Sequence, residues 1–427
     1  MKTTLPITPE SITRTTLANG LTLLIKENHN NASVTLRGRI RAGGLYDTEK
    51  NSGLAHFTTA ALQRGTRKRS FQKLNDELDR NGMSFGIGAG METIGLSAKS
   101  LVEDFEHVLD IVAETLMHPT FPRVEVEKLR REFLADLKEA DDDTQHVAYR
   151  EFRAMCYPSS HPYHRLSEGT TKTVKRITTK MMQDYHACYY RPDVTTVVIV
   201  GDLRADQAIE MIDRKLGVWK AKGHPEPYGI PDAPKPKQIL RKVAPIPGKM
   251  QADVVIGYPG IRRSDPDYYA LNIGDLIFGR LGLYGRLGAN VRDKQGLAYY
   301  VYSGVEANVG AGPWAVHAGV NPRNVDRAVE GILTEIKRLR SEPVAQDELA
   351  EAQDFLTGSL ALRLETNEGV AATLSDIEMF NLGLDYLQRY PNIIRSITAE
   401  QILAASQKYA QIENYALAIS GPVDGKQ

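Results

Sequence analysis

The sequence predicts an α+β protein with two homologous domains. Strands precede helices in each half, a proline-rich stretch separates the halves, and one order of elements recurs at a fixed offset. This order favours a mixed or antiparallel sheet with helices packed on one face of each domain. Two such domains, related by pseudo-symmetry, are expected to be arranged as one half of a clam shell. The length of 427 residues agrees, because one hydrophobic core rarely serves so long a chain.

The boundary between the domains is predicted from residues 221–248. This stretch is mostly polar and carries Pro225, Pro227, Pro231, Pro234, Pro236, Pro245 and Pro247. Such a composition is typical of an extended, semi-rigid linker. We therefore expect an N-terminal domain over residues 1–220 and a C-terminal domain over residues 249–427.

The elements of the first half follow from hydrophobic periodicity. Alternating or β-branched segments predict strands around the Asn19-Gly20 turn (14–26) and at 33–40 and 195–200, and a strand pair over residues 83–96. Apolar residues at helical spacing, with Ser70 as an N-cap, predict helices at 54–62, 70–81, 102–116, 124–139, 144–155 and 177–189.

The second half repeats the first at an offset of 220 residues. The segment from Ile177 leads into a helix, a strand and Gly201, and the segment from Ile397 leads into a helix, a strand and Gly421 (397 − 177 and 421 − 201). The same offset places residues 105–112 against 325–332, and residues 127–137 against 347–357. Two coincidental helix–strand pairs are the alternative, but a shared order at one offset favours a duplicated fold.

Charge and composition exclude several classes of function. Lys and Arg (53) balance Asp and Glu (53), so nothing in the net charge indicates nucleic acid or an anionic membrane as a partner. No apolar run approaches the roughly 20 residues of a membrane span. Residues 1–11 lack the features of a secretory signal, which favours a cytoplasmic protein; a periplasmic one is the alternative if a signal has been removed. Cys156 and Cys188 indicate two free thiols rather than a single bridge.

The predicted helix after Gly53 holds the first candidate site. His56 lies on one helix face with Thr59 and Ala60. A Glu and a second His at those two positions would complete the inverted zinc-peptidase order H-x-x-E-H, in which two His bind the metal and the Glu is the general base. This chain has neither residue, so the helix lacks a base and a second imidazole.

Two further groups of residues could bind metal. The helix at 124–139 carries Glu125, Glu127, Glu132, Asp136 and Glu139, which alone indicates a solvated helix face rather than a third zinc ligand. His161 and His164 have a chelating spacing, but Pro158 and Pro162 favour a loop in which both have a structural role.

The C-terminal half contains the second candidate site. Residues 278–288 are rich in glycine, but the strand–GxxxxGK[ST]–helix order of a phosphate-binding loop is missing. Arg292 and Tyr299 follow, separated by Gly296, which allows a turn. An Arg and a Tyr flanking such a turn can donate hydrogen bonds to one carbonyl or carboxylate. The alternative is a surface Arg and a strand Tyr without a shared role.

Together these segments resemble the pitrilysin/insulinase family of inverted zinc peptidases, in particular its short bacterial members similar to mitochondrial processing peptidase subunits. Gly53-Leu54-Ala55-His56-Phe57 with Gly65-Thr66 is similar to the zinc-helix segment, and residues 291–299 are similar to the C-terminal R-E-x-x-G-L-A-Y signature. The resemblance spans nearly the whole chain. It implies two homologous α+β domains per unit, and two units that close around a chamber for unfolded peptides.

The family's site residues carry over only in part. The first zinc ligand falls on His56, the catalytic Glu on Thr59 and the second His on Ala60. The third ligand falls on Asp136, 76 residues after Ala60 (136 − 60), and an outer-shell Glu seven residues earlier falls on Leu129. The resemblance therefore implies a degenerate zinc site, with no metal or other cofactor in this chain.

The C-terminal signature, by contrast, is intact. The resemblance implies that Arg292 and Tyr299 reach the zinc site of the other unit and bind the substrate carbonyl there, an oxyanion-type role. We therefore expect a non-catalytic subunit of a heterodimer, whose zinc-binding partner supplies metal and base for cleaving unfolded peptides. A peptide-binding or scaffold protein without activity is the alternative. An active peptidase with an atypical metal site is disfavoured by Thr59 and Ala60.

Overall fold

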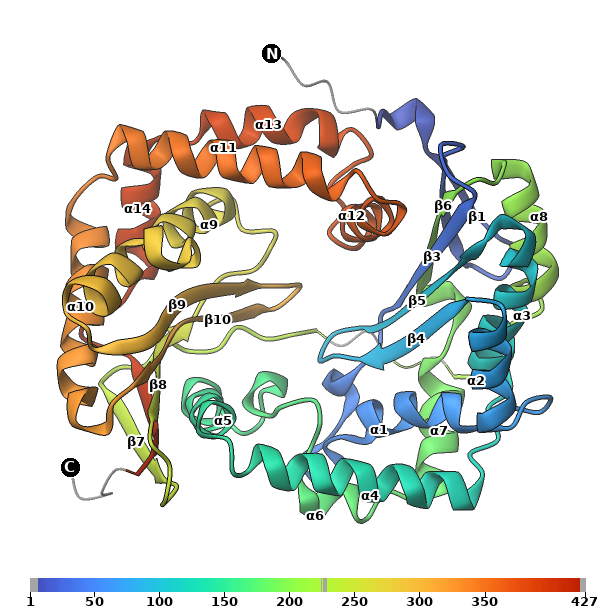
Figure 1. Cartoon of the computed structure of the whole chain (residues 1–427), viewed down its shortest axis with the longest axis horizontal. Helices are drawn as coiled ribbons and strands as arrows, with labels where there is room; N and C mark the ends of the chain where they lie inside the picture. Colours follow the sequence, from blue (N-terminus) through green and yellow to red (C-terminus); the bar gives the residue numbers. More distant parts are fainter. Residues whose placement is uncertain (1–6, 224, 226–228, 423–427) are drawn as a thin grey trace. The chain divides into compact units, whose positions relative to one another are not determined.

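The structure, a computed structural model, describes residues 7–223, 225 and 229–422. It divides into two compact units, each assembled from separate segments of the chain (Figure 1). Unit 1 takes its residues from 1–136, 166–228 and 359–389, and unit 2 from 137–165, 229–358 and 390–427. No helix among the described residues is long and apolar enough to cross a membrane.

Unit 1 contains a mixed six-stranded sheet in the order β1-β2-β6-β3-β5-β4. Its strands are β1 (Thr13–Thr16), β2 (Thr22–Glu27), β3 (Ser33–Ile40), β4 (Ser84–Ala89), β5 (Ile94–Leu101) and β6 (Thr195–Gly201). Only β2 and β6 are parallel, and every other neighbouring pair is antiparallel. The strands predicted from alternation are confirmed, including the β1–β2 hairpin, whose turn places Gly20 at φ 90°.

Unit 2 repeats this topology with five strands in the order β7-β11-β8-β10-β9. They are β7 (Leu240–Pro245), β8 (Ala252–Pro259), β9 (Ala298–Ala307), β10 (Ala311–Val320) and β11 (Ala416–Gly421). The first pair is parallel and the others are antiparallel, as in β2-β6-β3-β5-β4. The predicted duplication is therefore confirmed by strand order and by strand direction.

The helices also recur between the halves. The first half forms α1 (Leu54–Ala61), α2 (Phe71–Arg80), α3 (Phe105–Met117), α4 (Arg123–Ala140), α5 (Thr144–Cys156), α6 (Thr171–Val174), α7 (Thr179–Tyr189) and α8 (Ala205–Leu216). The second half forms α9 (Tyr268–Asp275), α10 (Val325–Ser341), α11 (Gln346–Arg363), α12 (Asn367–Met379), α13 (Tyr386–Ser396) and α14 (Ala399–Tyr409). Ser70 caps α2 by accepting the backbone N–H of Lys73, as the sequence predicts.

Helices cover both faces of each sheet, whereas the sequence predicts helices on one face only. On β8, Val254 and Ile256 face the main core of unit 2, whereas Gly257 and Asp253 face α5. Every residue of β8 and β11 is buried. Strands that are buried along their whole length have cover on both sides, because successive side chains point to opposite faces.

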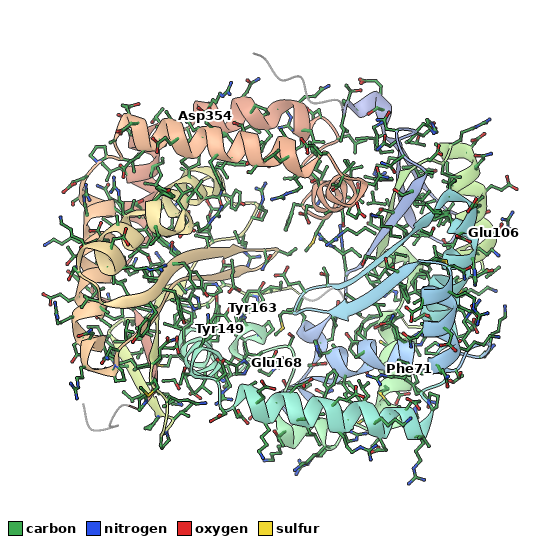
Figure 2. All side chains as sticks on the ribbon, in the orientation of Figure 1. Phe71, Glu106, Tyr149, Tyr163, Glu168 and Asp354 are labelled. Atoms are coloured by element: carbon green, nitrogen blue, oxygen red, sulfur yellow. The ribbon has the colours of Figure 1, made fainter. Side chains whose placement is uncertain are left out.

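The second covering helix of each sheet comes from the other half of the sequence. In unit 1, α12 lies against β3 and β6, with Asp376 paired to Arg39 and the Asn367 amide donating to the Ser33 carbonyl at 3.2 Å. In unit 2, α5 lies against β8 and β11, and Tyr149 on α5 donates to Glu306 on β9 (Figure 2). The units thus exchange residues 137–165 and 359–389 relative to the linear division expected from the linker.

The stretch predicted as a linker is only partly a linker. Residues 240–245 form β7, which pairs in parallel with β11 at the edge of the sheet of unit 2. An edge strand tolerates Pro245 at its end, since one side of the strand needs no ladder hydrogen bonds. Part of the remaining stretch, residues 224 and 226–228, lies outside the described residues.

Candidate functional site

The N-terminus of the α1 helix in unit 1 is held by the conformation of Gly53 and by hydrogen bonds to Asp47. Gly53 has φ 91°, and a Cβ there would meet the Glu168 carbonyl oxygen at 2.6 Å, so only glycine fits. The buried Asp47 carboxylate accepts the backbone N–H groups of Gly53 at 2.9 Å and Ala55 at 3.2 Å. A carboxylate at this end also interacts favourably with the helix dipole. These contacts fix where the side chains of α1 point.

His56 uses one ring nitrogen for structure. Its Nδ1 lies 3.0 Å from the Ala89 carbonyl oxygen at the end of β4, and because a carbonyl only accepts, Nδ1 carries the proton. The second nitrogen, Nε2, is then an acceptor. The imidazole ring lies 5.4 Å from the ring of Phe133 on α4. His56 thus retains the tautomer that a metal ligand would need, with Nε2 free to coordinate.

Thr59 occupies the position of the missing base, and its hydroxyl is already committed. It donates to the Ala55 carbonyl at 2.7 Å and lies 2.7 Å from the Tyr190 hydroxyl, which therefore donates to it. Both residues are buried, and burial raises the pKa of Tyr190 well above its usual value. The two neutral hydroxyls form a satisfied hydrogen bond between α1 and the residue that follows α7, and neither can act as a base towards water.

The remaining positions do not complete a metal site. Ala60 has no ligand atom, and Asp136 is exposed on α4, where Phe133, one turn earlier, contacts His56 instead. Leu129, at the outer-shell position, is 2% exposed within the core. No group of three or more His, Cys, Asp or Glu side chains in the described part of the chain could hold a metal ion. Zinc needs at least three protein ligands, so this donor set does not fit it.

The Arg292–Tyr299 segment of unit 2 is arranged differently. A π-helical segment, Gly288–Lys294, is followed by a turn at Gly296, which has φ 62°, and Tyr299 lies at the start of β9. The buried side chains of Val291 and Leu297 anchor the two ends of the turn, joined by a 3.0 Å hydrogen bond between Leu297 N–H and the Val291 carbonyl. The predicted turn at Gly296 is therefore present.

Both candidate donors of this turn point into solvent. Arg292 is exposed, and Tyr299 is 59% exposed. Neither side chain hydrogen-bonds to another residue within 7–223, 225 or 229–422. Exposed donors on a rigid turn are available for a ligand, since no intramolecular partner competes for them.

Gly279 and Gly288 allow close packing within residues 278–288. A Cβ on Gly279 would meet the Ser303 hydroxyl at 2.4 Å, and one on Gly288 would meet the Gly282 carbonyl at 2.1 Å. Gly282 has a positive φ of 62°, which favours glycine. The segment is folded into π-helical and 3-10 turns against β9, not into a strand–loop–helix unit. Packing and backbone conformation therefore explain these three glycines without a phosphate ligand.

His161 and His164 have the structural role that the sequence indicates. His161 accepts the backbone N–H of Tyr163 through Nδ1 at 3.0 Å and donates from Nε2 to the Pro231 carbonyl at 2.9 Å. His164 donates from Nδ1 to the Tyr157 carbonyl at 2.8 Å. Three of the four ring nitrogens are thus used within the protein.

Sequence reasoning missed the two aromatic residues that contact His56 and Thr59. The Phe133 ring is tilted against the His56 ring, and the Tyr190 hydroxyl hydrogen-bonds to Thr59, although both residues lie far from α1 in the chain. The only available signal was indirect: helix 124–139 places Phe133 three residues before Asp136, on a similar face.

Comparisons with known proteins agree with the observed fold. A family model described as insulinase (peptidase family M16) matches residues 22–164, and one described as the peptidase M16 inactive domain matches residues 176–356. A crystal structure of a peptidase M16 inactive domain from Pseudomonas fluorescens has a TM-score of 0.90 at 26% identity, covering 97% of this chain and 99% of that one. The chain is thus similar over nearly its whole length to a protein of known structure.

Two curated relatives are similar over most of their length. The beta subunit of the mitochondrial-processing peptidase of Saccharomyces cerevisiae is 26% identical over 382 residues, covering 86% of this chain and 81% of that protein. The uncharacterized zinc protease YmxG of Bacillus subtilis is 23% identical over 411 residues, covering 96% of this chain and 98% of that protein.

Proposed function

The chain belongs to the insulinase family of peptidases, M16, and from this premise we propose that it is the non-catalytic subunit of a heterodimeric zinc peptidase. A homologous partner with an intact H-x-x-E-H helix supplies the metal and the general base. This chain supplies Arg292 and Tyr299, which bind the substrate at the partner's zinc site. The substrates are unfolded peptides.

One observation carries the proposal, namely the contrast between the two family signatures. In unit 1, Thr59 is buried in a hydrogen bond to Tyr190 and Asp136 is exposed, so the chain cannot activate water for itself. In unit 2, Arg292 and Tyr299 are both exposed on an anchored turn. Loss of selection on the whole site would not be expected to leave two free donors on a well-formed turn.

The chemistry of the two donors suits peptide cleavage. A guanidinium and a phenol can each donate to the oxygen of a scissile carbonyl, and these bonds strengthen as the oxygen gains negative charge. Such donors stabilise the developing oxyanion, but cleavage also requires a metal and a metal-activated water as the nucleophile. Since this chain provides neither, a second subunit must do so. The Saccharomyces cerevisiae relative is itself named as a subunit.

The direct test is reconstitution with a homologous protein that has an intact H-x-x-E-H motif, first of all one encoded beside this gene. Neither chain alone should cleave an unfolded reporter peptide, and the mixture should cleave it. Arg292→Ala and Tyr299→Phe should abolish most of this gain. Lys294→Ala, which removes an exposed cation two residues from Arg292, and Tyr284→Phe, on a tyrosine that is 93% exposed, are the matched controls.

Two results would contradict the proposal. Full activity of the mixture with both Arg292→Ala and Tyr299→Phe would remove the role assigned to the turn. Peptide binding by this chain alone, with no activity in any mixture, would favour the peptide-binding or scaffold alternative. Metal analysis adds an independent check, because stoichiometric zinc in the purified chain would contradict the donor set found around His56.

A further inference from the structure

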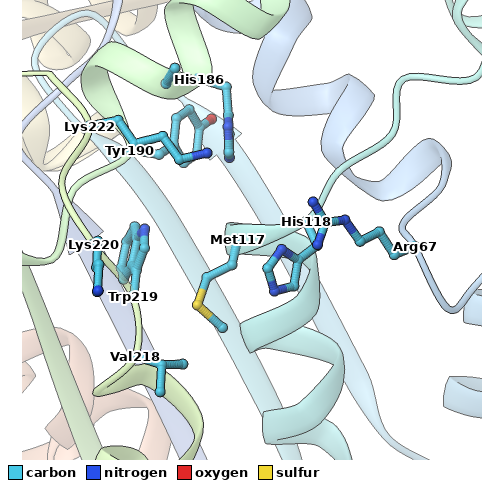
Figure 3. A pocket seen from close by; sticks show the side chains of 10 residues that line it. Arg67, Met117, His118, His186, Tyr190, Val218, Trp219, Lys220 and Lys222 are labelled. Carbon is cyan, nitrogen blue, oxygen red and sulfur yellow. The ribbon is translucent and has the colours of Figure 1, made fainter.

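A second feature of unit 1, separate from α1, is a cavity of about 230 Å³ between four segments of the chain. The segments are the loop at Arg67, the end of α3 at Met117 and His118, the α7 helix at His186 and Tyr190, and the residues that follow α8. Figure 3 shows these side chains gathered around one space. Nothing in the proposed peptidase role uses this cavity.

Positive charge dominates the lining. Arg67, Lys220 and Lys222 are all exposed, and none of them forms an ion pair with a carboxylate in the described part of the chain. No Asp or Glu is among the described residues that line the cavity. Three like charges around one small space repel one another, so a bound anion would relieve that repulsion.

The nearby acidic residue is already used elsewhere. Glu114 is buried on α3, where it pairs with Arg69 and accepts the backbone N–H of Lys68. It forms no ion pair with Arg67, Lys220 or Lys222. Burial and then the positive charge of Arg67 lower the pKa of His118, and the negative charge of Glu114 opposes this shift only in part.

The floor of the cavity is less polar than its rim. Trp219 and Tyr190 are 4% and 2% exposed, and Met117 is half-buried beside them. His186 donates from Nε2 to the Leu116 carbonyl at 2.8 Å, and burial lowers its pKa to about 4, so it stays uncharged. A ligand that fits both regions has an anionic end at the rim and an apolar end at the floor.

We propose that this cavity binds a small phosphate monoester whose phosphate lies among Arg67, Lys220 and Lys222 and whose apolar group rests on Met117 and Trp219. A phosphate monoester carries about two negative charges near neutral pH, which suits three cations better than the single charge of a carboxylate. An Arg side chain also matches the geometry of phosphate oxygens. The volume is below the ~300 Å³ of typical ligand pockets, so the ligand is small.

Phenyl phosphate is the probe, with inorganic phosphate and benzoate as comparisons. The chain has two tryptophans, and Trp219 lines the cavity, so saturable binding should change its fluorescence, and calorimetry should give the same dissociation constant. The signal should vanish in Trp219→Phe. Phenyl phosphate should bind more tightly than inorganic phosphate, which lacks the apolar group, and more tightly than benzoate, which carries only one negative charge.

Arg67→Ala and Lys222→Ala should each weaken binding of phenyl phosphate by about tenfold or more, because each removes a charge-assisted contact. Both side chains are exposed, so the fold should be retained. Lys172→Ala removes an exposed lysine of the same unit that does not line the cavity, and it should leave the affinity unchanged. Histidine NMR should also show the pKa of His118 rising when phenyl phosphate binds, since the anion offsets the charge of Arg67.

Absence of saturable binding by calorimetry would overturn the proposal. Equal affinities for benzoate and phenyl phosphate would overturn the phosphate assignment, and equal affinities for inorganic and phenyl phosphate would overturn the apolar contact. Equal losses in Lys172→Ala and Arg67→Ala would place the binding outside the cavity. None of these results depends on a partner subunit, so they are distinct from a failure of the proposed peptidase role.

Discussion

The α1 helix of unit 1 and the Arg292–Tyr299 turn of unit 2 differ in where their polar groups point. On α1, the side chain of His56 hydrogen-bonds to the Ala89 carbonyl, and that of Thr59 hydrogen-bonds to the Tyr190 hydroxyl. On the turn, Arg292 and Tyr299 are exposed and make no side-chain hydrogen bond within the described residues. Side chains satisfied internally stabilise a fold, whereas exposed donors on an anchored turn are available to another molecule.

The difference is informative because the two units have the same topology. Strands β2-β6-β3-β5-β4 and β7-β11-β8-β10-β9 share order and direction, although unit 1 has the additional strand β1. Residues of α1 should therefore affect stability, and residues of the turn should affect activity of the complex. Three predictions test this division and one tests the stability of both units in acid, from the largest expected effect to the smallest.

Arg292→Ala should produce the largest effect, and on activity alone. In the reconstituted complex we expect kcat/KM to fall by about 10²–10³-fold, the usual consequence of losing a donor to a developing oxyanion. The free energy of unfolding of the isolated chain should change by less than about 0.5 kcal/mol, since the side chain is exposed. Urea unfolding and peptide cleavage measure the two quantities, with Lys294→Ala as control. A loss of stability that matches the loss of activity would contradict the division.

Acid should destabilise both units through buried, uncharged histidines. Burial lowers the pKa of His186 in unit 1 and of His317 in unit 2 to about 4, below the usual 6.5. These histidines bind protons more readily in the unfolded chain than in the folded one. The free energy of unfolding is therefore unaffected above pH ~6.5 and falls as the pH drops from 6.5 towards 4. Each histidine should contribute roughly 3 kcal/mol to that loss. Urea unfolding at several pH values measures it.

The variant His317→Phe tests how much of the loss of stability in acid comes from unit 2. The His317 ring stacks on Tyr302 at 4.9 Å, and its Nδ1 has no hydrogen-bond partner among the described residues. His317→Phe should therefore keep the packing, retain stability near neutral pH and lose less stability in acid. An unchanged pH dependence in this variant would show that His317 does not contribute.

Thr59→Val should cost about 1–3 kcal/mol of stability, because it leaves the buried Tyr190 hydroxyl without its acceptor. The double variant Thr59→Val/Tyr190→Phe should recover part of that loss, since both polar partners are then gone. The control is Thr58→Val, at an equally buried hydroxyl that has no partner among the described residues, and it should be neutral. Similar losses at Thr58 and Thr59 would argue against a specific hydrogen bond to Tyr190.

His56→Ala should have the smallest effect. It removes one hydrogen bond to the Ala89 carbonyl and one ring contact with Phe133 from a half-buried position, worth about 1 kcal/mol. Zinc titration should give the same weak binding before and after the change, because His56 has no second ligand. A loss of tight zinc binding in the variant would show that His56 is a metal ligand after all.

Much of the fold was predictable from local patterns. Alternation placed β3 at residues 33–40 without error, and the 220-residue offset anticipated the shared strand order of the two units. The prolines of residues 221–248 were less informative, since residues 240–245 form strand β7. Proline at an edge strand and proline in a linker give the same composition, and only pairing with β11 distinguishes them.

The sequence by itself determined which chemistry the zinc helix lacks, because Thr59 and Ala60 carry no base and no ligand wherever they lie. It also determined the Gly296 turn, since a positive φ favours glycine. Only the tertiary structure decided that Tyr190 satisfies Thr59 and that the Phe133 ring packs beside His56. Such contacts join segments far apart in the chain, and periodicity reports which face of a helix is buried but not which segment buries it.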